Sequence, residues 1–227
     1  MRFPAIADVA AAKYYSVLDG VQQDESQMIS AQEALERLKE GNRRFVADIH
    51  NDHKLTRQSG FKLIPEQHPI AIILGCSDSR VPAEMIFDQG LGDLFVIRVA
   101  GNVAAPSQLG SVEYAAAVVG TRLVVVLGHS HCGAVHATLE ELERPSESLS
   151  PNLRSIVDHI RPALEELGDT KDADALMEQA VRANINASVN QLRQGSEILE
   201  QLINTDGLLV VGAEYSLETG AVVFFDN

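Results

Sequence analysis

Two apolar runs, each followed directly by glycine, restrict the fold of this chain more than any other feature. They are Ile70 to Leu74 and Leu123 to Leu127. Runs of branched aliphatic residues without polar alternation are typical of strands buried on both faces, as in a parallel sheet. Similar runs at 94–99 and 207–215 indicate two further strands of this kind.

Helical segments are expected between these strands. Periodicity, capping signals and alanine-rich composition place them at 31–47, 82–88, 108–119, 134–142, 150–167 with a break near Pro162, 172–194 and 196–204. Residues 221–225 should pair back on 207–215 as a hairpin. The alternation predicts an α/β fold with a mainly parallel central sheet, about four parallel strands plus an antiparallel edge strand, flanked by helices. We expect one domain over 1–227, with an N-terminal helical arm at 1–28 and a helical excursion at 145–206.

Charge and hydropathy exclude several classes of partner. The net charge of −14 argues against nucleic acid and anionic membranes, because both are bound through basic patches. No apolar run reaches the length of about 18 residues needed to span a bilayer. The opening segment MRFPAIADVAAAKYY has a single arginine, and Asp8 interrupts its apolar stretch, which is unlike a secretion signal. We therefore expect a cytoplasmic protein.

Metal-ligating side chains follow the two glycine-terminated runs. Cys76 comes directly after the first, and His129 and Cys132 come after the second. The carboxyl ends of parallel strands share one edge of the sheet, where ligands bind. Both cysteines of the chain lie in these two segments, and thiolate with imidazole is the usual ligand set of zinc. A disulfide is the alternative, but nothing marks the chain as a small secreted scaffold. Three protein ligands favour a catalytic zinc with an open fourth position.

Asp78 and Arg80 follow the first cysteine at alternate positions, so an extended segment presents all three side chains on one face. They could form an ordinary surface ion pair of little energetic value. A free carboxylate beside zinc would take the open position unless another group held it away. Bidentate pairing with Arg80 could hold Asp78, which would then orient zinc-bound water through a hydrogen bond.

These residues resemble two motifs of the β-class carbonic anhydrases. The segments CSDSR at 76–80 and HSHCG at 129–133 are similar to the family's two zinc segments, and the resemblance extends from Ser30 to Leu139 and more weakly over 181–225. It implies that Zn²⁺ is held by Cys76, His129 and Cys132, with Asp78 and Arg80 as the catalytic dyad. In some members the aspartate itself ligates zinc in a closed form. The implied reaction is reversible hydration of CO2 to bicarbonate and a proton, by zinc-bound hydroxide attacking CO2 in an apolar pocket.

The resemblance also implies substrate-binding residues and self-association. Gln67 matches a glutamine whose amide bonds substrate, Phe95 and Tyr114 match aromatic walls of the CO2 pocket, and Gly133 matches a position whose backbone N–H faces the site. Each of these residues also has an ordinary structural explanation. The family builds its sites across a dimer, often doubled to a tetramer, with N-terminal helices that embrace the neighbour.

Four further positions bear on the resemblance. Arg98 and Asn102 lie in VIRVAGN, which is similar to the strand end bordering the family's site. His131 replaces the small residue common in the family, and could serve as a proton shuttle or a surface group. Ile73 stands where members with a regulatory bicarbonate site carry tryptophan, so we expect no such site here.

Other functions fit the sequence less well. A related hydrolase acting on carbonyl sulfide or carbon disulfide would use the same zinc ligands. A non-catalytic zinc or scaffold protein would need a fourth ligand, which Asp78 alone could provide. No G-x-G-x-x-G motif supports dinucleotide binding, and the cysteines lie too far apart for the C-x-x-C of a thiol oxidoreductase.

Overall fold

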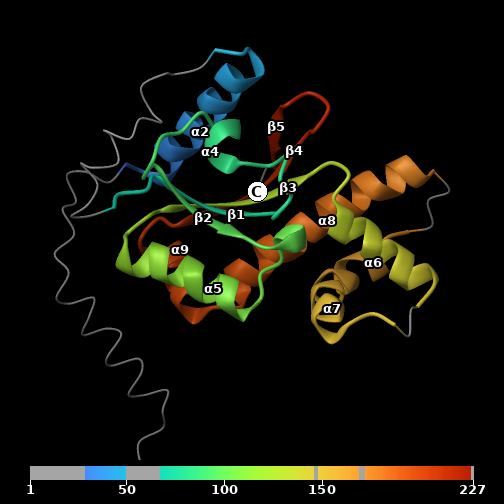
Figure 1. The fold of residues 1–227 in the computed structure, drawn as a ribbon. Coiled ribbons are helices and arrows are strands. Elements are labelled where there is room, and N and C mark those ends of the chain that lie inside the picture. Colours follow the sequence, from blue (N-terminus) through green and yellow to red (C-terminus); the bar gives the residue numbers. More distant parts are fainter. Residues whose placement is uncertain (1–28, 50–66, 146–147, 169–171, 226–227) are drawn as a thin grey trace, which may run out of the picture.

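The computed structural model describes residues 29–49, 67–145, 148–168 and 172–225. A five-stranded sheet runs through this part of the chain in the order β2-β1-β3-β4-β5 (Figure 1). The strands are β1 (Ala71–Gly75), β2 (Leu94–Arg98), β3 (Leu123–His129), β4 (Leu209–Tyr215) and β5 (Val222–Phe224). The first four are mutually parallel, and β5 pairs antiparallel with β4 at one edge. The predicted fold class is confirmed, while the expected arm at 1–28 lies outside the described residues.

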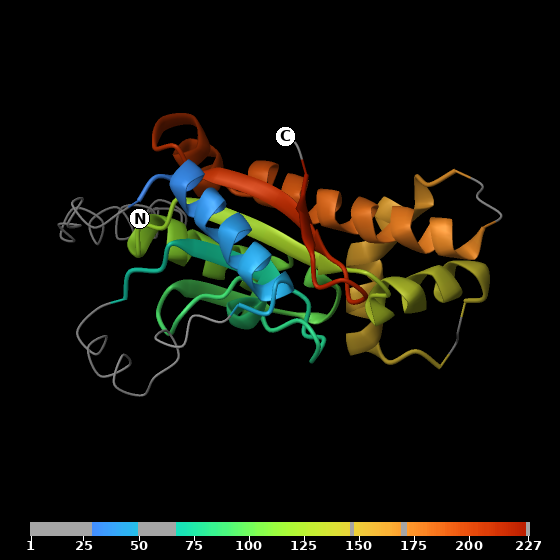
Figure 2. The ribbon, with the colours of Figure 1, turned by 90° about the horizontal axis from the view of Figure 1, so that it is seen from above.

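Helices cover both faces of the sheet (Figures 1 and 2). They are α2 (Ala31–Val46), α4 (Ala83–Ile86), α5 (Pro106–Glu113), α6 (Gly133–Glu143), α7 (Pro151–Glu165), α8 (Ala173–Gln194) and α9 (Glu197–Thr205), with short η2 (Ala100–Asn102) and η3 (Tyr114–Val118) turns. None of these helices combines the length and apolar character needed to cross a bilayer.

The core is divided by the sheet because successive side chains of a strand point to opposite faces. Ile73 and Val125 pack with α2 and α4 on one face. Ile72 and Val124 pack on the other face with residues of α5, α8 and α9. The strands β1 and β3 are buried on both faces, which explains why their sequences are apolar throughout. Their carboxyl ends are thereby fixed side by side.

The expected break at Pro162 is wrong, because α7 continues through this residue. Pro162 lies in the last turn of the helix and is exposed. Proline lacks an N–H, so the carbonyl of Asp158 loses its helical donor. Asp158 is exposed as well, and water can satisfy that carbonyl without ending the helix.

Candidate active site

Two neighbouring strands deliver the three candidate ligands to one edge of the sheet. Cys76 follows β1 directly, and His129 is the last residue of β3, which pairs with β1. A tight turn after His129 brings Cys132 to the N-cap of α6. All three side chains are buried. The sequence prediction that these residues converge is therefore confirmed by their positions.

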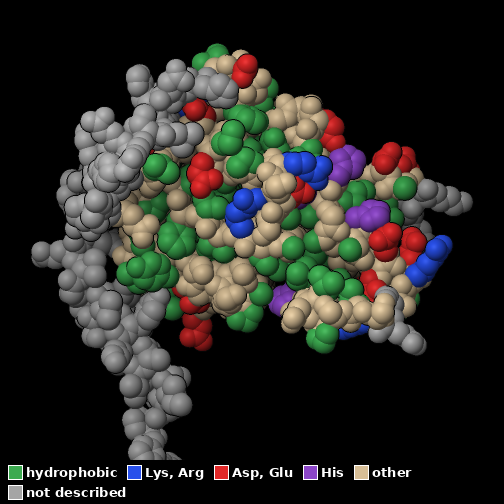
Figure 3. All heavy atoms as spheres, in the orientation of Figure 1, with side chains coloured by type: hydrophobic (Ala, Val, Ile, Leu, Met, Phe, Trp, Pro, Cys, Tyr) green, Lys and Arg blue, Asp and Glu red, His purple; other side chains and the backbone are tan. Residues whose placement is uncertain are grey.

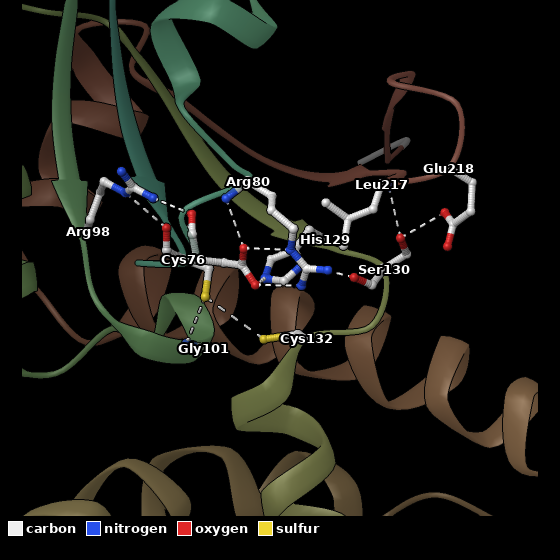
Figure 4. Close-up of polar contacts among 10 residues, drawn as sticks. Cys76, Arg80, Arg98, Gly101, His129, Ser130, Cys132, Leu217 and Glu218 are labelled. Atoms are coloured by element: carbon white, nitrogen blue, oxygen red, sulfur yellow. Dashed lines mark hydrogen bonds and ion pairs between the residues drawn. The ribbon is translucent and has the colours of Figure 1, made fainter.

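The ligand atoms form a compact group (Figure 4). The sulfur atoms of Cys76 and Cys132 lie 4.0 Å apart. Together with a ring nitrogen of His129 they all fall within 4.8 Å of one another, which suits a single metal ion. The backbone N–H of Gly101 donates to the Cys76 sulfur over 3.4 Å. The backbone N–H groups of Ala134 and Val135, at the start of α6, favour the thiolate form of Cys132 and oppose the rise in its pKa. Donors of this kind stabilise thiolates.

The two sulfur atoms lie within hydrogen-bond distance, and either thiol could be the donor. The hydrogen bond with Cys132 lowers the pKa of Cys76 well below its ordinary value of 9.0, even though burial opposes the shift. The same hydrogen bond, together with burial, raises the pKa of Cys132. A cation bound between the sulfurs would displace thiol protons, since a thiolate rather than a thiol ligates metal.

The ring of His129 has one satisfied and one unsatisfied nitrogen. Nδ1 lies 2.9 Å from the carbonyl oxygen of Ser130, and because a carbonyl accepts only, Nδ1 carries the proton. Nε2 is fully buried and has no hydrogen-bond partner among the described residues. A buried lone pair without a donor is costly, and a metal ion would satisfy it. The donor set therefore fits a metal ion.

Asp78 is held by Arg80 at the mouth of the ligand group. Its Oδ1 accepts from the backbone N–H of Arg80 over 3.0 Å and from Nε over 2.9 Å, and its Oδ2 accepts from Nη2 over 2.8 Å. These bonds lower the pKa of Asp78, so the carboxylate is ionised. The predicted pairing is present, and within the described chain Asp78 is not one of the clustered ligands.

The expected pocket residues are only partly assembled. The rings of Phe95 on β2 and Tyr114 on η3 lie 6.3 Å apart between centroids, and Phe95 packs on the core cluster that contains both cysteines. Gly133 opens α6 directly after Cys132, and a Cβ at Gly133 would meet nothing within 4 Å. Gln67 is exposed and precedes β1, at the edge of the sheet opposite Cys76.

A hydrogen-bonded turn after β4 supports the segment that carries His129, and sequence reasoning missed it. Ser130 Oγ donates to the Glu218 carboxylate over 2.9 Å and accepts from the backbone N–H of Leu217 over 2.9 Å (Figure 4). His131 Nε2 lies 2.7 Å from the same carboxylate. His131 is exposed, and its φ of 54° lies in the left-handed region. No local pattern links Glu218 to residues so far away in the sequence.

Surface charge around the site is mixed. On the face shown in Figure 3, basic side chains lie among acidic and apolar ones and form no continuous basic patch.

Comparison with known proteins identifies the family. Residues 71–222 match the family model described as carbonic anhydrase. The carbonic anhydrase of Mycolicibacterium smegmatis is 41% identical over 187 residues, which cover 82% of this chain and 88% of that protein. The solved β-carbonic anhydrase CcaA is 30% identical, with a TM-score of 0.68 and coverage of 85% and 87%. A structure from a study of two tetrameric β-carbonic anhydrases of Sordaria macrospora is 25% identical, with a TM-score of 0.66 and coverage of 74% and 86%. The chain belongs to the β-class carbonic anhydrases, a family of enzymes.

Proposed function

We propose that Cys76, His129 and Cys132 hold a zinc ion, at which this enzyme reversibly hydrates CO2 to bicarbonate and a proton. The buried, unpartnered Nε2 of His129 beside two sulfurs 4.0 Å apart carries this proposal. Tetrahedral zinc with Zn–S bonds of about 2.3 Å places its sulfurs about 3.8 Å apart, close to the observed spacing. When bound, zinc supplies the Lewis acidity that lowers the pKa of water toward neutrality.

The aspartate and arginine orient the reacting water. Asp78 is ionised, and its Oδ2, which accepts one hydrogen bond from Arg80 where Oδ1 accepts two, keeps a lone pair that can accept a hydrogen bond from a water molecule and fix its direction of attack. Arg80 engages both carboxylate oxygens and prevents Asp78 from turning into the ligand group. Asp78 therefore acts as an oriented acceptor, and as a metal ligand only in a closed form in which Arg80 releases it.

The CO2 pocket is proposed to include Phe95, Tyr114, the backbone N–H of Gly133 and the amide of Gln67. Phe95 and Tyr114 provide an apolar wall, which suits a substrate without charge. Gln67 is separated from the ligand edge of its own chain by the length of β1, about 16 Å for a five-residue strand. It would therefore serve the site of a second copy, in a dimer or in a tetramer such as those named for Sordaria macrospora.

Cysteine chemistry supports a reducing compartment for this enzyme. Both thiols are free in the structure and are assigned to the metal. Such a site is compatible with the cytoplasm, where thiols stay reduced. We therefore place the enzyme there.

Stopped-flow CO2 hydration between about pH 6 and 9, on protein with assayed zinc, tests the proposal. Rapid hydration by zinc-loaded protein, absent after chelation and restored by added zinc, is expected. Zinc-loaded protein that hydrates no CO2 at any pH would contradict the proposed activity. Hydration that survives complete removal of the metal would contradict the ligand assignment.

A further inference from the structure

Arg98 spans the segment that joins the first cysteine to the aspartate. It is the last residue of β2, beside Gly75 of β1 in the sheet register. Its Nε donates to the carbonyl oxygen of Cys76 over 3.0 Å, and its Nη2 donates to that of Asp78 over 2.5 Å. Figure 4 shows the guanidinium approaching this segment from the side opposite His129. The rigid guanidinium of Arg98 therefore binds the carbonyls on either side of Ser77.

The hydrogen bonds of Arg98 reinforce the few backbone hydrogen bonds that join the segment after Cys76 to β2. Beyond the last pair of β1 and β2, the backbone N–H of Ser77 donates to Val99 O over 3.3 Å, a long hydrogen bond. The side-chain bonds of Asp78 all go to Arg80, which lies in the same loop and cannot fix that loop to the sheet. The Asp78 carbonyl also accepts from Val81 N–H, again within the loop. Arg98 thus provides the charged hydrogen bonds that tie the loop to β2.

The geometry points to Arg98 as a positioning residue that keeps the Asp78 carboxylate paired with Arg80 and out of the metal's open position. This inference rests on the proposed zinc site. Oδ2 of Asp78 is already 3.9 Å from Nε2 of His129, so a small rotation of the loop would turn the carboxylate toward the ligand group. The Arg98 guanidinium resists that rotation because it fixes the carbonyls on either side of Ser77. Hydrogen bonds of this charged type are the stronger ones in proteins.

Azide binding to cobalt-substituted protein tests the inference, because azide needs the open position and cobalt reports coordination in its visible spectrum. In Arg98→Met, the affinity for azide and kcat/KM for CO2 should each fall about tenfold, the loss expected for charged hydrogen bonds. They should fall by the same factor, since both depend on the fraction of molecules with an open site. In Arg98→Lys, whose side chain can reach one carbonyl but not both, the affinity for azide and kcat/KM should each fall by an intermediate factor.

Arg193→Met is the matched control. Arg193 also donates to a strand carbonyl, that of Val210, but at the amino-terminal half of β4. It should change neither azide affinity nor kcat/KM. Zinc content and thermal unfolding should be the same in all four proteins, and Arg98→Lys carries the test if Arg98→Met does not fold.

Three results would overturn the inference. One is unchanged azide affinity and kcat/KM in the Arg98 variants, and another is a fall of the two quantities by different factors. The third is loss of zinc from a variant that unfolds at the normal temperature, which would show that Arg98 supports the Cys76 ligand instead. A wild-type protein that binds metal but neither responds to azide nor hydrates CO2 would contradict the proposed function itself.

Discussion

Nε2 of His129 lies 3.9 Å from Oδ2 of Asp78 and has no hydrogen-bond partner among the described residues. Burial alone would lower the pKa of His129, but the nearby Cys76 sulfur and its negative charge raise it. Asp78 also contributes to this rise. The ring nitrogen, the sulfurs and the carboxylate thus all favour positive charge at one point. That point is where we place the metal.

Removal of the histidine ligand should abolish zinc binding, whereas removal of a nearby surface histidine should not. His129→Ala should lose its bound zinc, and its rate of CO2 hydration should fall by more than about 100-fold. Mutating a residue that only hydrogen-bonds a metal ligand can already lower activity by up to that factor. His136→Ala is the control, because His136 is exposed on α6 and pairs with Glu140. Zinc assay and stopped-flow hydration measure both effects. Full zinc in His129→Ala would refute the ligand assignment.

The carboxylate of Asp78 should matter for rate but not for zinc content. Asp78→Asn keeps the shape of the side chain and loses its charge, so the reacting water is no longer oriented by an anionic acceptor. We expect kcat to fall about 10- to 100-fold with zinc retained. Steady-state kinetics with parallel zinc assay decide the matter. Wild-type kcat in Asp78→Asn would exclude the aspartate from the mechanism.

Gly101 should tolerate no side chain. Its φ is 72°, and a Cβ there would lie 2.7 Å from Cδ1 of Ile160 and 3.1 Å from the Cβ of Ala134. Gly101→Ala should lower the free energy of unfolding by about 2 kcal/mol. Gly110→Ala is the matched control, because nothing lies within 4 Å of its Cβ and helix α5 should gain about 0.5–1 kcal/mol. Denaturant unfolding of both variants tests this, and equal stability would contradict the crowding at Gly101.

Glu218 should stabilise the fold in a pH-dependent manner. Its own backbone N–H, Ser216 and Ser130 donate to the carboxylate and lower its pKa from 4.5 to about 2. Because the folded pKa is the lower one, this stabilisation is complete above pH 4.5 and is lost as the pH falls toward 2. Wild type should therefore be more stable than Glu218→Gln at pH 7, by a margin that shrinks steadily below pH 4.5. Denaturant titrations at several pH values measure the margin, and a constant margin would be inconsistent with this assignment.

Mixing two defective chains should restore activity if Gln67 serves the site of a neighbour. A Gln67→Leu chain has intact zinc ligands, and a His129→Ala chain has an intact Gln67. In a hybrid dimer, the zinc of the first chain would meet the glutamine of the second. We expect refolded mixtures to exceed the summed activity of the separate variants, whereas mixtures that show only the sum would place Gln67 with its own chain or outside the site.

The ligand group could be predicted from sequence because its determinants are local. Cys76 and His129 follow buried runs whose parallel pairing fixes where they emerge, and Cys132 lies one tight turn further on. The Asp78–Arg80 pair likewise spans a single short loop. These positions depend on strand geometry, which the apolar pattern encodes directly.

Features that depend on tertiary packing could not be predicted in this way. The sequence pattern suggested one helix at 108–119, but the chain begins α5 at Pro106 and changes to π-helical winding at Tyr114. The contacts of Arg98 with the Cys76 segment and of Glu218 with Ser130 join residues distant in the sequence. No local signal specifies such contacts, because sheet order and turn packing bring the partners together.

The separation of Cys76 and Cys132 along the chain has a consequence for folding. A metal ion shared by residues 56 positions apart would act as a cross-link that closes a loop containing α4, β2, η2, α5, η3 and β3. In the chain-entropy treatment used for disulfides, a cross-link closing a loop of this size removes disorder from the unfolded chain worth about 4 kcal/mol. The ion would thus restrict the unfolded ensemble as well as activate water, so the catalytic centre would also stabilise the fold as a cross-link.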